Sequence, residues 1–268
     1  MNDTILQLTE QAIYPAYAGC EERSALENKN GRYILSFGAG LNSTALLVML
    51  IEKNYPLDEV VFADTGGEVP ETYEHLKNVD SYLSKHGMPL KIVKSKNGTL
   101  YDTCARRKVI PSQIWRWSTR DYKITPIYAH YRSFGVPVIQ YLGIAYEERD
   151  RMKESGVPYV KNVFPLVENK LTRQDCMDII CLADFDFSMP VRSGCFFCPF
   201  NSLSRWTEIY EKHKDLFLKA KELEENSKHY PKQRLMKWTL RTLQEKLEKN
   251  EPLPNVYVKR LCSSECII

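Results

Sequence analysis

Two pairs of cysteines are the residues of this sequence whose type and spacing best suit chemistry. Cys195 and Cys198 form a C-x-x-C in an apolar stretch, and Cys262 and Cys266 form a C-x-x-x-C close to the end of the 268 residues. Four thiolates can hold tetrahedral zinc or a [4Fe–4S] cluster, and the softness of sulfur does not distinguish the two. We therefore predict a metal centre at these four positions, with unligated buried thiols as the simpler alternative. A redox disulfide is less favoured, because a thioredoxin-like context is missing.

The remaining four of the eight cysteines are scattered, unlike those of a small secreted disulfide scaffold. The segment Met1–Glu10 is polar and lacks the basic and then apolar order of a secretory signal, so we expect a reducing, cytoplasmic location. Hydrophobic residues make up 43% of the chain, which excludes general disorder. No apolar run approaches the roughly 20 residues of a membrane-spanning helix. The net charge of +3 is too small to indicate nucleic-acid binding on its own.

The elements that position these cysteines follow from how the apolar runs alternate. Short buried runs such as Tyr33–Phe37 end at glycines or polar residues, and longer apolar segments such as Thr44–Ile51 follow them. This alternation predicts an α/β fold with a doubly wound, mostly parallel sheet, in which ligands bind beyond the carboxyl ends of the strands. The strands are predicted at residues 33–37, 59–63, 91–94 and 138–144, and helices at residues 44–51 and 70–86.

The end of the chain is predicted to be helical. After Leu203, apolar residues from Trp206 to Leu223 recur on one helical face, and a second helix is expected over Leu235–Leu247, before an extended tail. We therefore divide the chain into an α/β domain over residues 1–200 and a helical C-terminal region over residues 201–268, which carries the terminal cysteine pair.

A glycine-bearing loop joins the first predicted strand to the helix that follows it. Glycines let the backbone turn closely, so that N–H groups at a helix N-terminus can face an anion, and hydroxyl groups add further donors. The alternative is an ordinary strand-to-helix turn, capped by Asn42 or Ser43. It is not a Walker A loop, since no Gly-Lys-Ser/Thr follows. The residues predicted to bind a phosphate group are Ser36, Gly38, Ala39, Gly40, Asn42, Ser43 and Thr44.

A basic stretch with interspersed aromatic residues runs from Arg106 to Lys123. Its cations suit phosphate groups and its rings can stack on bases, so it predicts contact with a nucleotide or with a nucleic acid such as tRNA or DNA. A solvated loop whose tryptophans anchor it to the core is the alternative. The cations are Arg106, Arg107, Lys108, Arg116, Arg120 and Lys123, and the rings are Trp115, Trp117 and Tyr122.

The glycine-bearing loop resembles the Ser-Gly-Gly-Lys-Asp-Ser pyrophosphate loop of the adenine-nucleotide α-hydrolase (PP-loop) superfamily, with Leu41 and Asn42 replacing the lysine and the aspartate. Further segments resemble, in the right order, the phosphoadenosine phosphosulfate (PAPS) reductase family over residues 32–200. An uncharacterised branch of that family carries a similar Gly-Cys-x-x-Cys-Pro-Phe and a terminal C-x-x-x-C. The matching segments are Phe62–Gly66 with Pro70–Thr72, Arg116–Pro126, Leu142–Arg151 and Phe164–Leu166.

This resemblance implies an adenine-nucleotide α-hydrolase-like (HUP-type) fold that binds ATP or PAPS, with Mg²⁺ as a further candidate cofactor. It implies catalytic roles for Lys123 and Arg151, although Arg151 and Glu148 could equally form a surface ion pair worth under about 1 kcal/mol. Ser118 replaces a cysteine of the family, so no thiol role is expected there. The further cofactor-binding residues that the resemblance implies are Asp64, Thr65, Gly66, Gly143 and Glu148.

Three functions are compatible with these residues. The favoured one is ATP-dependent activation of an acceptor, for example a nucleic acid, followed by sulfur transfer with the four-cysteine centre. The second is a sulfonucleotide reductase in which Cys266 attacks the sulfate of a bound nucleotide, although the Gly-x-His of authentic reductases does not follow Cys266. The third is a non-catalytic nucleotide-binding protein whose metal staples the tail to the domain, for which the uncharged Leu41 and Asn42 would be expected.

Overall fold

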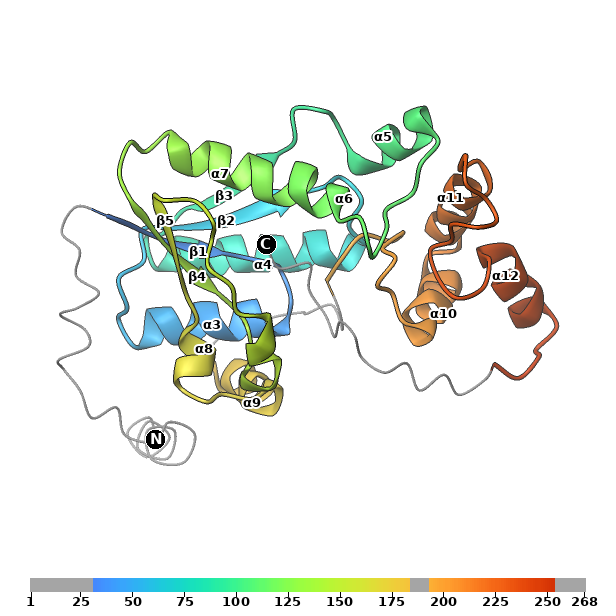
Figure 1. The fold of residues 1–268 in the computed structure, drawn as a ribbon. Helices are drawn as coiled ribbons and strands as arrows, with labels where there is room; N and C mark the ends of the chain where they lie inside the picture. The colour runs from blue at the N-terminus through green and yellow to red at the C-terminus, as the bar shows by residue number, and fades with distance from the viewer. Residues whose placement is uncertain (1–30, 184–192, 254–268) are drawn as a thin grey trace. The chain divides into compact units, whose positions relative to one another are not determined.

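The computed structural model describes residues 31–183 and 193–253, which form an α/β fold around a five-stranded sheet (Figure 1). Its strands are β1 (Arg32–Ser36), β2 (Glu59–Asp64), β3 (Leu90–Lys94), β4 (Val138–Leu142) and β5 (Val160–Val163). They lie in the order β3-β2-β1-β4-β5, and β1 pairs in parallel with both β2 and β4. The chain thus builds outward from β1 in one direction and then restarts beside β1 with β4, which confirms the predicted doubly wound, parallel fold.

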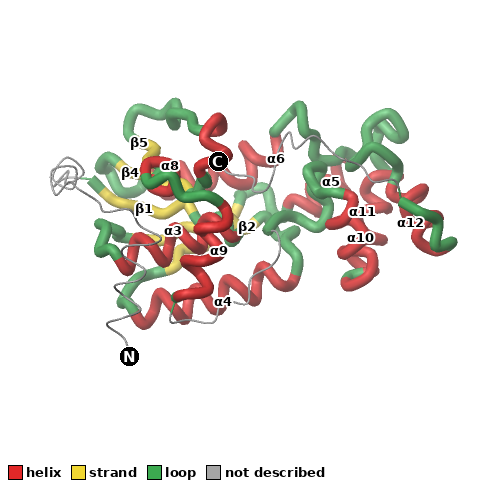
Figure 2. The backbone as a smooth tube through the Cα atoms, turned by 90° about the horizontal axis from the view of Figure 1, so that it is seen from below, coloured by secondary structure: helices red, strands yellow, loops and turns green. Residues whose placement is uncertain are grey.

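Helices join these strands and form the end of the described chain, as Figure 2 shows. None of the described helices is both long and apolar enough to cross a membrane. Up to β4 the helices are α3 (Leu41–Glu52), α4 (Pro70–Lys85), α5 (Leu100–Arg107), α6 (Trp117–Thr119), the π-helical turn η1 (Arg120–Ile124) and α7 (Thr125–Arg132). After β4 they are the 3₁₀-helix η2 (Tyr146–Arg151), α8 (Pro165–Glu168), α9 (Arg173–Leu182), α10 (Leu203–Lys212), α11 (Lys214–Glu225) and α12 (Leu240–Glu248).

Helix α3 is buried along most of its length, from Leu41 to Leu50. It packs beside α9, and both views show the two helices side by side (Figures 1 and 2). A helix covered in this way needs no polar face, which explains why its sequence is apolar on nearly all sides. The packing holds the N-terminus of α3 firmly at the end of β1.

The described residues divide into two compact units, which we describe separately. Unit 1 comprises residues 31–61, 78–91 and 131–183, and unit 2 comprises residues 62–77, 92–130 and 193–253. The core of unit 2 contains Trp206, Phe217 and Tyr122, all at most 1% exposed, and the C-x-x-C segment belongs to the same core. The division of the chain at residue 200 stays a prediction.

The four predicted strands are confirmed, with ends within two residues of the expected positions. Strand β5 was not predicted. It is only four residues long and contains Lys161 and Asn162, so its sequence lacks the apolar pattern of a strand. The expected cap at Asn42 or Ser43 is wrong, since the N-cap of α3 is Gly40. Ser43 is the third helical residue, and its Oγ accepts the Gly40 N–H at 3.1 Å.

The C-terminal helices also differ in detail from the prediction. The face expected from Leu203 to Leu223 is split at His213 into α10 and α11, and α12 begins at Leu240 rather than Leu235. The fully buried Glu224 explains the late start, because its carboxylate accepts the N–H groups of Leu235 at 2.8 Å and Leu240 at 2.7 Å. Burial raises the pKa of Glu224, although these two backbone hydrogen bonds oppose the rise.

Candidate functional site

The predicted site residues fall into two groups, one in each unit. In unit 1, the loop after β1 and the loop after β4 meet at the switch point of the sheet, where parallel α/β sheets bind ligands. Gly143 follows β4 directly, and a Cβ added there would lie 2.8 Å from Ser43 Cα and 2.9 Å from Ser43 N. Because these are backbone atoms, only glycine lets the first turn of α3 approach the end of β4 this closely.

The loop after β1 is held by its own hydroxyl groups. Ala39 adopts the left-handed conformation with φ +56°, and Gly40 then caps α3. The hydroxyls of Ser43 and Thr44 donate to the Gly40 carbonyl at 3.0 and 2.9 Å. In this structure these hydroxyls order the turn, and their role as donors to a phosphate stays a prediction. The first N–H groups of α3 have no intrahelical acceptor and suit an anion.

Asn42, Glu148 and Arg151 form a chain of polar contacts in unit 1. Asn42 Nδ2 donates to Glu148 Oε2 at 2.9 Å, and Arg151 Nη1 donates to Glu148 Oε1 at 2.6 Å. Since a carboxylate only accepts hydrogen bonds, the NH₂ group of Asn42 must face Glu148, and Oδ1 must face away. That oxygen is buried and has no hydrogen-bond partner among the described residues. The predicted ion pair is therefore present, and it also orients Asn42.

Replacing Asn42 by aspartate, the residue of the superfamily loop, should destabilise the protein. The new carboxylate would face Glu148, so a hydrogen bond is lost and two like charges meet. We expect the free energy of unfolding to fall by about 1–3 kcal/mol at neutral pH. The loss should shrink at mildly acidic pH, because one carboxyl of the pair then takes up a proton. Urea unfolding at both pH values measures this effect. Asn42→Ala adds no charge, and an equal pH dependence in that variant would contradict the explanation.

In unit 2, the C-x-x-C turn is docked on the segment that follows β2. Phe196 N–H donates to the Gly67 carbonyl at 2.8 Å, and Glu68 and Cys195 form an antiparallel bridge. A Cβ on Gly67 would lie 2.8 Å from the Phe197 ring, so any larger residue here would have to displace this fully buried side chain. The two residues that follow the Asp-Thr-Gly segment, which the resemblance assigns to the nucleotide, thus support the cysteine turn.

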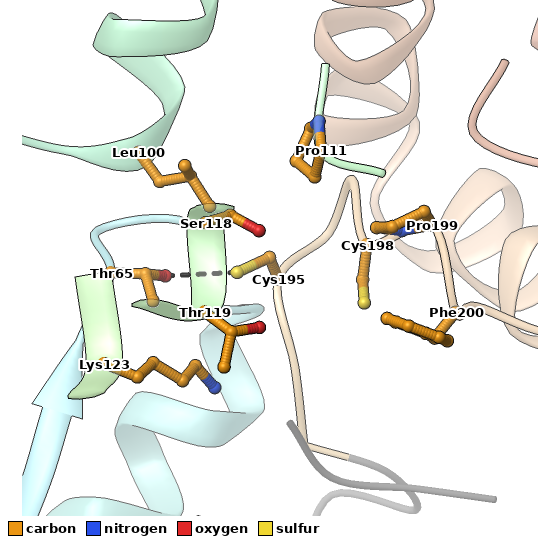
Figure 3. Close-up of a pocket in the computed structure, with 10 residues that line it drawn as sticks. All are labelled: Thr65, Leu100, Pro111, Ser118, Thr119, Lys123, Cys195, Cys198, Pro199 and Phe200. Carbon is orange, nitrogen blue, oxygen red and sulfur yellow. Dashed lines mark hydrogen bonds between the residues drawn. The ribbon is translucent and has the colours of Figure 1, made fainter. Parts of the chain in front are cut away.

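Thr65 links the two segments through its side chain. Its hydroxyl donates to Glu68 Oε1 at 3.0 Å, accepts the Gly67 N–H at 3.2 Å and lies 3.1 Å from Cys195 Sγ (Figure 3). Cys195 Sγ also lies 3.6 Å from Glu68 Oε1. Sequence reasoning missed Glu68, which is 6% exposed, because no motif marks it.

Cys195 and Cys198 line one pocket of unit 2 (Figure 3), which we call the thiol pocket. Both side chains are buried, and the Cys198 N–H donates to the Cys195 carbonyl at 3.0 Å, which closes the turn. Lys123 lines the same pocket, as predicted for a functional lysine, although its catalytic role stays a prediction. Ser118, where the family has a cysteine, also faces this pocket. Its lining residues are Thr65, Leu100, Pro111, Ser118, Thr119, Lys123, Cys195, Cys198, Pro199 and Phe200.

Asp64 and Gly66 have structural partners in unit 2. Asp64 Oδ1 accepts the Gly66 N–H at 2.8 Å and the Tyr73 hydroxyl at 2.9 Å, and Lys94 lies 3.3 Å from Oδ2. Burial, and then the Asp64 charge, raise the pKa of Tyr73. Gly66 has φ +71°, a conformation that side chains disfavour. Nucleotide binding by these two residues stays a prediction.

The complete four-cysteine centre cannot be traced, because Cys262 and Cys266 lie outside the described residues. Within residues 31–183 and 193–253, no group of three cysteine, histidine or acidic side chains is arranged to hold a metal ion. Cys195 and Cys198 are thus the described half of the predicted ligand set. Cys104 is not among the residues that line the thiol pocket, and burial raises the pKa of its thiol to about 12 although Arg107 opposes the rise.

The sheet order and the glycine-bearing loop at its switch point define a Rossmann-like fold. The sequence model of the phosphoadenosine phosphosulfate reductase domain matches residues 32–168, and the chain belongs to this family. The family consists of enzymes, and it binds adenine nucleotides. This membership confirms the family expected from the sequence motifs.

Solved structures show more distant similarity. The phosphate complex of PAPS reductase from Candida auris has a TM-score of 0.44 and 15% identity, over 70% of this chain and 89% of that chain. The U34-tRNA thiolase NcsA from Methanococcus maripaludis, with its [4Fe–4S] cluster, has a TM-score of 0.48 and 13% identity, over 99% of this chain and 87% of that chain. No curated protein matches the chain.

Proposed function

We propose that the protein is a nucleotide-dependent sulfur-transfer enzyme. It binds ATP at the N-terminus of α3 in unit 1 and handles sulfur at the thiol pocket of unit 2. The observation that carries the proposal is the thiol pocket, where two buried cysteines share one space with a lysine and with the hydroxyls of Thr65, Ser118 and Thr119. Family membership supplies the adenine nucleotide.

The residues of unit 1 fit an adenine nucleotide with Mg²⁺. The first-turn N–H groups of α3 suit the phosphates, which compensates for the missing lysine at Leu41. The buried Asn42 Oδ1, which lacks a hydrogen bond among the described residues, is an oxygen of the kind that Mg²⁺ or a ligand hydroxyl requires. Glu148 and Arg151 support it, because they determine which way the Asn42 amide faces.

The residues of unit 2 fit a thiolate-bound metal. Cys195 and Cys198 would supply two sulfur ligands, and Cys262 and Cys266 the other two. Four thiolates would fill the coordination of zinc or of a [4Fe–4S] cluster, so the group would supply a site for the transferred sulfur when one of the four cysteines gives up its place. The Thr65 hydroxyl and Glu68 orient Cys195, since both contact its sulfur.

The reaction needs no external oxidant or reductant when hydrosulfide is the donor. A carbonyl oxygen of the acceptor attacks the α-phosphate of ATP, and pyrophosphate leaves. Hydrosulfide then attacks the activated carbon, the carbon–oxygen bond breaks, and AMP leaves as a thiocarbonyl forms. The Lys123 ammonium, in the thiol pocket, is suited to hold an anion such as hydrosulfide in position.

The acceptor is proposed to be a nucleic acid, tRNA or DNA, bound through the Arg106–Lys123 segment. Six cations and one acidic residue, Asp121, lie in that segment. Its positive charge is therefore far more concentrated than the net charge of +3 over the whole chain. Phosphate groups favour such a concentration of positive charge. Nucleobases also carry the carbonyl groups that the proposed reaction requires.

Pyrophosphate release and thionucleoside formation test this function together. The full-length protein, purified without oxygen, is supplied with ATP, sodium sulfide and either bulk tRNA or DNA. We expect pyrophosphate release that depends on one nucleic acid, and a thionucleoside in its digest by mass spectrometry. ATP turnover without a thiolated product would overturn the proposal. Sulfite release from PAPS, abolished by Cys266→Ser, would instead establish the reductase function.

A further inference from the structure

The segment between α5 and η1 forms a rim of the thiol pocket. Its two ends line the pocket, with Pro111 on one side and Ser118 and Thr119 on the other. Between them, Gln113 Nε2 donates to the Pro199 carbonyl at 2.6 Å, and the Arg116 guanidinium lies 5.7 Å from the centre of the Phe200 ring. Pro199 and Phe200 are themselves lining residues. The tip of this segment is thus attached to the pocket from both directions.

The tip carries two large apolar side chains that face solvent. Ile114 is 86% exposed and Trp115 is 77% exposed, whereas Trp117 packs against the core of unit 2. The tip is an ordered turn, because Ser112 Oγ accepts the N–H groups of Ile114 at 3.2 Å and Trp115 at 3.3 Å. An ordered turn that displays an indole ring to water marks an interaction site.

Exposed cations occur on both sides of this tip. Arg106, Arg107 and Lys108 are exposed at the end of α5, and Arg116 and Arg120 are exposed after the tip. Of these, Arg120 pairs with Asp121 at 2.7 Å. An exposed flat ring in a segment that carries several guanidinium and ammonium groups suits a ligand with flat bases and phosphates. Charge and ring together favour a nucleic acid.

The state of the bases follows from the geometry of stacking. A base inside a duplex has both faces covered by its neighbours, whereas a base that is unpaired or turned out offers a free face on which a protruding indole can stack. We propose that Trp115 stacks on an unpaired base of a single-stranded nucleic acid, and that the tip thereby holds the acceptor at the rim of the thiol pocket. The role of the bound strand as the acceptor rests on the proposed function, whereas the stacking itself rests on the exposed ring of Trp115.

Binding of one sequence in three forms tests the inference. The full-length protein is titrated into fluorescently labelled single-stranded RNA, single-stranded DNA and the matching duplex. We expect Trp115→Ala to weaken binding of a single strand about tenfold. Duplex binding should be nearly unchanged, because the cations remain. The two single strands show whether the partner is RNA or DNA. Unchanged single-strand binding, or an equal loss for the duplex, would overturn the inference.

Three variants separate stacking from other effects. Trp115→Phe keeps a ring and should retain most of the affinity, whereas Leu218→Ala removes an exposed apolar side chain elsewhere in unit 2 and should change nothing. Arg107→Gln should weaken single strand and duplex alike and reduce the salt dependence. Capture of a protein that depends on Trp115, with no single-strand binding, would assign the tip to a protein partner instead. Because the measurement uses no ATP or sulfide, it tests stacking separately from thiolation. Loss of thiolation activity alone would count against the proposed function, and unchanged single-strand binding alone would count against the stacking.

Discussion

Cys195→Ser should abolish sulfur transfer and remove most of the bound metal. The serine hydroxyl can still hydrogen bond with Thr65 and Glu68, so the turn keeps its local partners and the protein should fold. A hydroxyl is a poor ligand for a soft metal, however. Removal of a residue that only supports a metal ligand typically lowers metal affinity or activity about 10–100-fold, and removal of the ligand itself should lower them further. We therefore expect at least about a 100-fold decrease in the rate of thionucleoside formation. Cys198→Ser should behave in the same way.

Metal content provides a readout that does not depend on activity. Protein purified without oxygen is analysed for iron and zinc, and an iron–sulfur cluster would also give a broad absorbance band at roughly 400 nm. Cys181→Ser, on the exposed surface of α9, and Cys104→Ala, at a buried thiol of unit 2, serve as controls and should retain the metal. Full metal content in both Cys195→Ser and Cys198→Ser would rule out the four-cysteine centre. A colourless wild-type protein with one zinc would favour a structural staple for the tail.

The fold could be predicted because its signals are local. Strands β1, β2 and β4 are apolar runs that end at a glycine or at polar residues, and the alternation of strands with helices predicts the parallel topology. Strand β5 escaped prediction because its pairing with β4, and not its own four residues, makes it a strand. The cap of α3 escaped it as well, since Ser43 reaches back to Gly40 from inside the helix. Both outcomes depend on neighbours that a short window of sequence does not contain.

The candidate site was predictable in its residues but not in their connections. The Asp-Thr-Gly segment and the C-x-x-C are each recognisable, but the contact between Thr65 and Cys195 joins positions 130 residues apart. Likewise, the basic aromatic segment looked uniform in sequence, and the structure separates it into the buried Tyr122, the anchored Trp117 and the exposed Trp115. Which ring faces water depends on the core of unit 2, to which the distant helices α10, α11 and α12 supply seven of the seventeen buried residues.

Gly143→Ala should impair nucleotide binding more than its effect on stability would suggest. The added Cβ would lie 2.8 Å from Ser43 Cα and 3.0 Å from the Asn42 carbonyl carbon, and neither backbone atom can rotate away. The end of β4 and the first turn of α3 must therefore move apart, which should lower the free energy of unfolding by about 1–3 kcal/mol. The same movement displaces the N–H groups that are proposed to hold the phosphates. We expect the affinity for ATP to fall at least about tenfold, the equivalent of one lost hydrogen bond.

Gly156→Ala is the matched control, because it should cost similar stability without disturbing the loop. Gly156 has φ +68°, so alanine there is strained by about 1–2 kcal/mol, but its Cβ would meet no atom within 4 Å. Urea unfolding and calorimetric titration with ATP compare the two variants. If the nucleotide binds at the first turn of α3 as proposed, only Gly143→Ala loses affinity. If both variants bind ATP as tightly as the wild-type protein, the switch point between β1 and β4 is not the nucleotide site. If both lose affinity equally, the loss is caused by lower stability alone.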